Sequence, residues 1–128
     1  MTVMATQNSS LVDEWRELLT RHARVNEALE RDLQRKHGLS VTEFEALQRL
    51  ADKSDDGCRL QQLVEDVHMS QSALSRLISR LTDEGLVERR GCSADRRGFY
   101  ACITEEGRQR LAEAEPTQHD VLSRTLSA

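Results

Sequence analysis

The most constraining feature of this sequence is residues 70–85, where a regular apolar stripe alternates with small and basic residues. Four aliphatic residues stand at i, i+3, i+4 and i+7: Leu74, Leu77, Ile78 and Leu81. This spacing predicts a helix with one buried face. Ser70 can cap its first turn, and Gly85 can supply the left-handed residue that ends it.

The opposite face of this helix carries short hydroxyl side chains between long hydrogen-bond donors: Gln71, Ser72, Ser75, Arg76, Ser79 and Arg80. Such a face can lie close to another surface while its longer side chains reach further. The major groove of double-stranded DNA admits one helix, and there Gln can pair with adenine and Arg with guanine. An ordinary amphipathic surface helix has the same pattern, so the residues that follow must distinguish the two.

Two short runs rich in β-forming residues, 86–90 and 99–103, flank a polar segment with a glycine at each end. This arrangement predicts a β-hairpin. Four arginines lie on or beside its tip: Arg89, Arg90, Arg96 and Arg97. Arginines suit a narrow minor groove, where the negative potential is strongest, and Asp95 can orient Arg97 by a hydrogen-bonded ion pair. A recognition helix followed by a basic hairpin predicts a winged helix.

In these segments the sequence resembles the MarR-type transcriptional regulators. The resemblance covers about residues 10–127 and is carried by residues 60–64, 70–77, 81–87, 95–98 and 103–107. It implies a dimeric winged-helix protein that binds double-stranded DNA, usually as a repressor. The resemblance also implies release by a small aromatic ligand or by oxidation in many members.

Composition limits the remaining possibilities. A chain of 128 residues corresponds to one domain, and 3% aromatic residues predict an aliphatic, helical core. No apolar run approaches the length of a membrane span, and the N-terminus lacks the order of a signal peptide, which predicts a cytoplasmic protein. The three cysteines, Cys58, Cys92 and Cys102, show neither a disulfide framework nor zinc-ligand spacing.

The net charge of −4 argues against nucleic acid unless the charge is unevenly distributed. Residues 68–103 hold six basic and four acidic groups, whereas residues 38–67 hold three and seven. Residues 10–37 are balanced, and residues 104–128 are net acidic. The positive segment is therefore the one proposed to contact DNA, and local charge decides contact within a Debye length of about 8 Å.

Residues 10–37 predict one long helix that Gly38 can end, preceded by a disordered N-terminus at residues 1–9. Its apolar residues step by four and three, with His22 between them: Leu11, Trp15, Leu18, Val25, Leu29 and Leu33. This is the pattern of a helix that packs along a partner, and it is too long for so small a domain to cover. We expect a homodimer that contacts two half-sites of a pseudo-palindrome. An intramolecular bundle is the alternative.

Residues 38–103 are predicted to form the winged helix-turn-helix region. Thr42 and Glu45 match a capping box for a helix that ends near Asp52. A short extended piece at residues 58–60 then precedes a helix over residues 61–67 and a tight turn over residues 68–70.

Residues 104–128 predict a C-terminal dimerisation helix capped by Thr104, with Pro116 expected to kink or split it near Glu115. The family generally continues through one more amphipathic helix, so an incomplete C-terminal element is one expectation here. The expected fold class is mainly α with a small β-hairpin wing, with dimerisation helices flanking the winged helix-turn-helix.

The sequence shows no signature of an enzyme. It contains no nucleophile motif and no glycine-rich phosphate loop, and the histidines lack metal-ligand spacing: His22, His37, His68 and His119. We therefore expect no catalytic activity, no cofactor and no metal.

The sequence is compatible with two kinds of sensor, a thiol that responds to oxidation and a pocket for a small aromatic ligand. Cys92 lies among the wing arginines, which can stabilise a thiolate and favour oxidation. The peroxide-sensing branch of the family, however, has its reactive cysteine in the first helix, and no cysteine precedes Cys58 here. Alternatively, the family resemblance implies an aromatic ligand between the dimerisation helices and the winged region. Trp15, His22 and Phe44 could line that cleft, although they are equally plausible as core.

The sequence assigns six residues to the major groove and its phosphates: Ser70, Gln71, Ser72, Ser75, Arg76 and Arg80. Arg96 and Arg97 are assigned to the minor groove, with Asp95 orienting Arg97. The rival interpretation is a winged-helix module that binds protein instead of DNA.

Overall fold

The computed structural model describes residues 2–53, 57–92 and 95–126, with side chains described for residues 9–53, 57–90 and 100–126. Its elements are α1 (Thr2–His37), α2 (Val41–Ala51), β1 (Cys58–Arg59), α3 (Leu60–Val67), α4 (Gln71–Asp83), β2 (Val87–Cys92), β3 (Asp95–Ile103) and α5 (Glu105–Leu126). The predicted fold class, mainly helical with a small hairpin wing, is confirmed.

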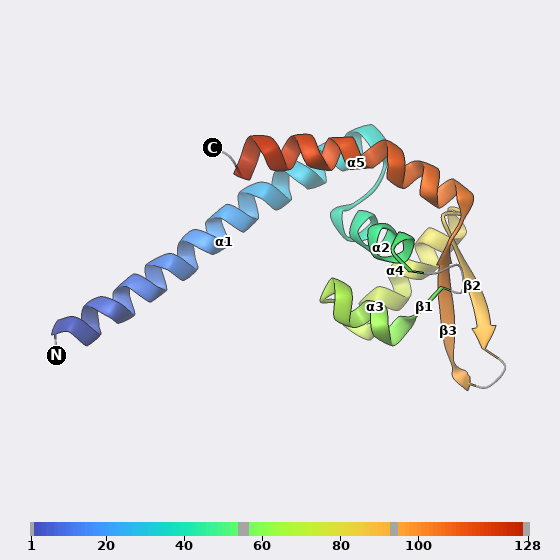
Figure 1. Ribbon diagram of the computed structural model, residues 1–128, viewed down its shortest axis with the longest axis horizontal. Helices are drawn as coiled ribbons and strands as arrows, with labels where there is room; N and C mark the ends of the chain where they lie inside the picture. Colours follow the sequence, from blue (N-terminus) through green and yellow to red (C-terminus); the bar gives the residue numbers. More distant parts are fainter. Residues whose placement is uncertain (1, 54–56, 93–94, 127–128) are drawn as a thin grey trace.

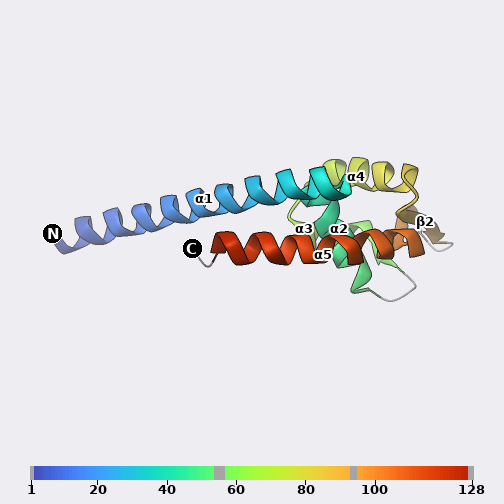
Figure 2. The same ribbon diagram turned by 90° about the horizontal axis from the view of Figure 1, so that it is seen from above.

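The helices and the sheet gather at one end of α1, and the N-terminal half of α1 extends away from them (Figure 1). Figure 1 shows α1 projecting away from the remainder, with α5 beside its C-terminal half and with α2, α3, α4 and the sheet at the opposite end. Figure 2 shows α1 and α5 side by side from above. The buried Asp32 of α1 accepts a hydrogen bond from Arg124 of α5 at 3.0 Å, and His37 bonds Thr117 at 2.7 Å. These contacts fix one long helix against the other.

The sheet is antiparallel with the strand order β1-β3-β2. Cys58 and Arg89 both pair with Ala101, while Arg59 and Arg90 both pair with Tyr100. Cys58 and Ala101 are fully buried, so the face that carries them packs on the core. Since successive side chains alternate between the two faces of a sheet, the row of Arg59, Tyr100 and Arg90 lies on the outer face.

The predicted hairpin is present, but its strands reach further towards the tip than expected. The sequence placed the strands at residues 86–90 and 99–103, whereas β2 runs to Cys92 and β3 begins at Asp95. The ladder is interrupted between Gly91 and Cys92. Main-chain pairing does not require β-forming side chains, so composition underestimated the strand lengths.

The core is aliphatic, as the low aromatic content predicts. Its fully buried members come from every helix and from the sheet: Leu33, Phe44, Leu47, Leu63, Leu74, Ile78, Leu81, Ala101 and Val121. Gly38 ends α1 with a φ of +66°, and the amide of Gly38 donates to the carbonyl of Gln34 at 3.0 Å. The sequence predicted this glycine stop correctly.

Two helix starts differ from the prediction. α1 begins at Thr2 instead of Ser10, so residues 2–9 are helical and not disordered as expected. These residues contain no glycine or proline, and a helix extends readily once it is nucleated. The cap of α2 is Ser40 paired with Glu43, and the predicted pair of Thr42 and Glu45 is wrong.

Burial explains the position of the α2 cap. With Ser40 as the cap, Leu39 and Phe44 stand at the two positions of a hydrophobic staple. Both side chains belong to the core, with exposed fractions of 0% and 1%. The Ser40 hydroxyl accepts from the Glu43 amide at 3.1 Å, and the Glu43 carboxylate accepts from the Ser40 amide at 2.9 Å.

α5 starts as predicted and continues where a break was expected. The Thr104 hydroxyl accepts a hydrogen bond from the Gly107 amide at 3.0 Å, which confirms the cap. Pro116 lies inside one continuous helix, so the expected split near Glu115 is wrong, and the alternative of a kink there stays a prediction. Proline removes one bond to the carbonyl four residues earlier, on Ala112. Both positions are exposed, so water can hydrogen-bond to that carbonyl.

Candidate nucleic-acid interface

α4 is a capped helix with a buried and an exposed face. The Ser70 hydroxyl accepts from the Ala73 amide at 3.2 Å, as predicted. Leu74, Leu77, Ile78 and Leu81 are all at most 4% exposed, which confirms the apolar stripe. Gly85 follows the helix with a φ of +80°, and its left-handed conformation turns the chain into β2.

The predicted major-groove residues lie away from the core. Ser70, Gln71, Ser72, Arg76 and Arg80 are exposed, and Ser75 is half-buried. The tight turn before α4 places His68 in the left-handed region, with φ 56° and ψ 43°, where its amide closes the last turn of α3. The turn and α4 together present a polar, basic helix face to solvent.

The structure describes the backbone of the wing except at residues 93–94. The side chains of residues 91–99 lie outside the described part of the structure, and so do residues 93–94 entirely. The expected roles of Asp95, Arg96, Arg97 and Cys92 therefore stay predictions. What the structure gives is the direction of the two strands that carry them.

Arg89, in strand β2 of the wing, contacts α4. Its pairing with the buried Ala101 places it on the core-facing side of β2, yet its side chain is exposed. Its Nη2 donates a hydrogen bond to the Ser79 hydroxyl of α4. The sequence placed Arg89 on or beside the hairpin tip, whereas the structure places it near the base of the hairpin, against α4.

A second arginine contact lies on the outer face of the sheet. Arg59 Nε donates to the Tyr100 hydroxyl at 3.1 Å, and the guanidinium carbon lies 5.5 Å from the ring centroid. On the same face, Arg90 lies 3.7 Å from the Glu88 carboxylate. Arg59 gives no signal in the sequence, because its partner is 41 residues away and leaves no local pattern.

The three residues predicted to line a ligand cleft do not come together within one chain. Phe44 is 1% exposed and belongs to the hydrophobic core, whereas Trp15 is 59% exposed on α1. His22 is also exposed on α1. Periodicity could not separate these environments, because a core helix and an interface helix show the same apolar spacing.

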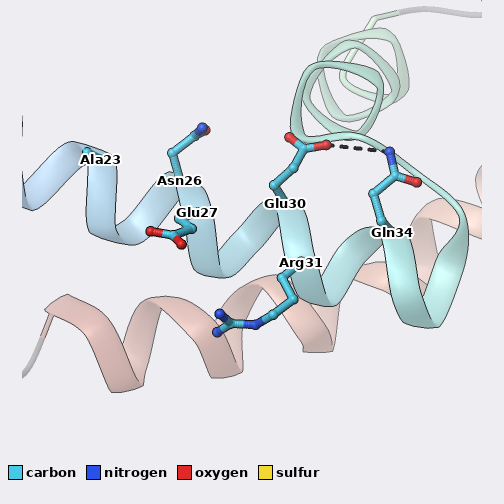
Figure 3. Close-up of a pocket in the computed structure, with 6 residues that line it drawn as sticks. All are labelled: Ala23, Asn26, Glu27, Glu30, Arg31 and Gln34. Carbon is cyan, nitrogen blue, oxygen red and sulfur yellow. Dashed lines mark hydrogen bonds between the residues drawn. The ribbon is translucent and has the colours of Figure 1, made fainter.

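A shallow groove does run along α1. It is lined by Ala23, Asn26, Glu27, Glu30, Arg31 and Gln34, all on that helix (Figure 3). Gln34 Nε2 donates to Glu30 Oε1 at 3.5 Å, and the other carboxylate oxygen of Glu30 accepts from the Val41 amide at 3.2 Å. Glu30 thereby joins α1 to the first turn of α2.

The described cysteines are buried. Cys58 lies on the core-facing side of the sheet, whereas Cys102 follows Ala101 in β3 and so lies on the opposite face, with an exposed fraction of 5%. Burial raises the pKa of the Cys58 thiol, and nearby Asp66 adds to the rise while Lys53 opposes it. A raised pKa disfavours the reactive thiolate.

Within the described residues, no group of three or more His, Cys, Asp or Glu side chains could hold a metal ion. No helix in that part of the chain combines the length and hydropathy needed to cross a membrane.

A tight turn between α3 and α4, followed by an antiparallel hairpin that packs on the same core, defines a winged helix-turn-helix protein. The pattern of the MarR family matches residues 39–99, from the start of α2 into the wing. AbsC, a MarR family transcriptional regulator from Streptomyces coelicolor, is 32% identical to this chain. That structural match covers 88% of this chain and 75% of AbsC, with a TM-score of 0.80. The chain belongs to the MarR family of transcriptional regulators.

Two further proteins are similar to this chain. Sco3205, a MarR family transcriptional regulator from Streptomyces coelicolor solved in complex with DNA, is 28% identical, and the match covers 93% of this chain and 73% of Sco3205 with a TM-score of 0.84. The transcriptional repressor MprA of Escherichia coli is 31% identical over 91 residues, which are 71% of this chain and 52% of MprA. The chain spans about half the length of the curated relatives that it matches.

Proposed function

We propose that this protein is a sequence-specific regulator that binds double-stranded DNA as a homodimer. α4 enters the major groove and the wing enters the adjacent minor groove. The observation that carries the proposal is the exposed, basic face of α4 next to a hairpin rich in arginine. Sco3205, which is similar over 93% of this chain, was solved in complex with DNA.

The homodimer is supported by an apolar surface on α1 that the chain leaves uncovered. Leu29 and Leu33 are buried against the rest of the protein, but the preceding part of the same stripe is exposed. Its large side chains have exposed fractions between 44% and 63%: Leu11, Val12, Trp15, Leu18 and Leu19. Leu126, at the end of α5, is 45% exposed as well. A contiguous apolar patch on a helix marks an interaction surface, and a twofold axis lets the same stripe cover itself.

The proposed direction of regulation is repression, as in the similar protein named transcriptional repressor MprA. This function requires the compartment that holds the DNA, in agreement with the cytoplasmic location predicted from the sequence. A reporter gene behind the bound site tests the sign: deletion of the regulator raises expression if it represses and lowers it if it activates.

We further propose that a small aromatic ligand releases the protein from DNA, as the family resemblance implies. Trp15 and His22 are exposed on α1, while Phe44 is buried, so a second copy must complete any site that uses the α1 residues. A thermal shift with a panel of aromatic acids tests this. Ligands that raise the melting temperature and release the DNA support the proposal, and an unresponsive panel contradicts it.

Selection of bound duplexes from a random pool tests the function itself. The expected product is an inverted repeat with half-site centres about 34–36 Å apart, one helical turn or a multiple of it. A single enriched half-site would contradict the homodimer. No enrichment at any salt concentration would contradict DNA binding and favour a protein-interaction module.

A further inference from the structure

The adjacent grooves of DNA are separated by one sugar-phosphate strand. α4 ends at Asp83 and β2 begins at Val87, so the wing leaves the core close to the end of the recognition helix (Figure 2). If α4 occupies a major groove and the wing the neighbouring minor groove, that strand must pass between them. A side chain placed there would meet a phosphate and not a base.

Arg89 is placed at this position. Its backbone lies in β2 near the base of the wing, and its guanidinium reaches Ser79 on α4. Ser79 stands in one row with Ser72 and Ser75, at spacings of three and four residues, along the polar face of the helix. The guanidinium therefore lies at the edge of the face proposed to enter the groove.

The chemistry of the pair suits a phosphate contact. A guanidinium carries five N–H donors in a fixed planar fork, so it can bond a serine hydroxyl and a phosphate oxygen at the same time. The bond to Ser79 fixes its direction before DNA arrives, which lowers the entropy lost on binding. Arg89 is exposed, so a phosphate can approach it without displacing the core.

We propose that Arg89 binds the phosphate between the two grooves and that Ser79 positions its guanidinium for this contact. The assignment rests on the proposed DNA-binding function. It adds a site that gives affinity without sequence preference, at the junction of two elements that contact bases. A purely structural bond between wing and helix would use the same two residues but would not respond to salt.

The salt dependence of DNA affinity separates these roles. Affinity of the full chain for the duplex recovered by selection is measured by fluorescence anisotropy between about 50 and 200 mM salt, the range over which phosphate contacts are readily counted. Arg89→Ala should lower the slope of log affinity against log salt by about 0.9, the value for one phosphate of B-DNA. Wild type should then lose about 3.5-fold more affinity than the variant over this range.

Two variants control the experiment. Arg49→Ala removes an exposed arginine of α2, outside the helix and the wing that are proposed to contact DNA, and should leave the slope unchanged. Ser79→Ala keeps the charge of Arg89 but removes its hydroxyl partner. It should weaken binding by about 2–10-fold, the equivalent of one hydrogen bond, with the slope retained. Circular dichroism confirms that each variant is folded.

The outcomes are distinct. A lower slope in Arg89→Ala alone supports the proposal. An unchanged slope in Arg89→Ala, with salt-dependent binding by wild type, overturns the Arg89 assignment and leaves the proposed function intact. Equal slope losses in Arg89→Ala and Arg49→Ala overturn the assignment to the junction. Absence of duplex binding by wild type overturns both.

Discussion

Gly107 offers the sharpest test of how α5 holds the wing in place. This residue lies in the first turn of α5, where a Cβ would stand 2.2 Å from the Leu86 carbonyl oxygen and 2.8 Å from Cγ1 of Ile103. The same carbonyl accepts the Thr104 amide at 3.1 Å, and the Thr104 hydroxyl donates to the Gly85 carbonyl at 2.7 Å. The cap residue of α5 is thus hydrogen-bonded to the turn that precedes β2, and Gly107 permits the close approach.

Gly107→Ala should destabilise the protein by about 1–3 kcal/mol. Forcing an atom into a packed contact costs about 1–3 kcal/mol, because backbone must shift. Loss of the hydrogen bond to Leu86 adds about 1 kcal/mol. Alanine has a greater helix propensity than glycine, which stabilises the helix by about 1 kcal/mol. This gain and the loss of the hydrogen bond nearly cancel.

Thermal unfolding followed by circular dichroism, at one protein concentration, measures the effect. A loss of 1–3 kcal/mol corresponds to a fall in Tm of roughly 3–12 °C for a chain of this size. Gln109→Ala, at an exposed position of the same turn, should leave Tm nearly unchanged. If Gly107→Ala melts at or above the wild-type temperature, α5 does not pack on Leu86 as described.

Three further predictions address the interface, the α2 cap and the buried thiol. Trp15→Ala should weaken self-association about 100–10,000-fold, because each of the two copies in the dimer loses about 1.5–3 kcal/mol of apolar burial, whereas Asp13→Ala should not. Sedimentation velocity measures both variants, and equal dissociation constants would place the interface elsewhere. Ser40→Ala should cost about 1 kcal/mol in urea unfolding and Thr42→Ala distinctly less, and the reverse order would restore the cap at Thr42. The raised pKa of Cys58 keeps its thiol protonated at neutral pH, so alkylation of Cys58 followed by peptide mass spectrometry should be far slower in native than in urea-unfolded protein. Comparable rates would contradict the burial of Cys58.

Local patterns predicted the elements that local residues determine. The apolar stripe from Leu74 to Leu81, the Ser70 cap and the Gly85 stop are set within one helix, and all three are confirmed. The sequence prediction chose the wrong cap for α2, because Ser40–Glu43 and Thr42–Glu45 both match the capping-box pattern and lie two residues apart. The choice between them depended on burying Leu39 and Phe44, which is a property of the whole core.

The candidate site was predictable in its main helix and not in its arginine contacts. Arg89 and Ser79 are 10 residues apart on different elements, and Arg59 and Tyr100 are 41 apart. Their pairing follows from the register of the sheet and its packing on α4, which periodicity does not contain. The apolar stripe of α1 shows the same limit of periodicity. Its apolar residues have the same spacing in the buried half and in the exposed half, so the spacing does not tell which half is exposed.

The central claim is that the exposed face of α4 contacts bases in the major groove. Its most direct test compares wild type and Arg76→Ala on the selected duplex and on duplexes with single base changes. Loss of a base-contacting arginine should cost about 1–3 kcal/mol and abolish discrimination at one position of each half-site, while discrimination elsewhere is kept. If Arg76→Ala weakens every duplex by the same factor, or none of them, α4 does not recognise sequence through this residue.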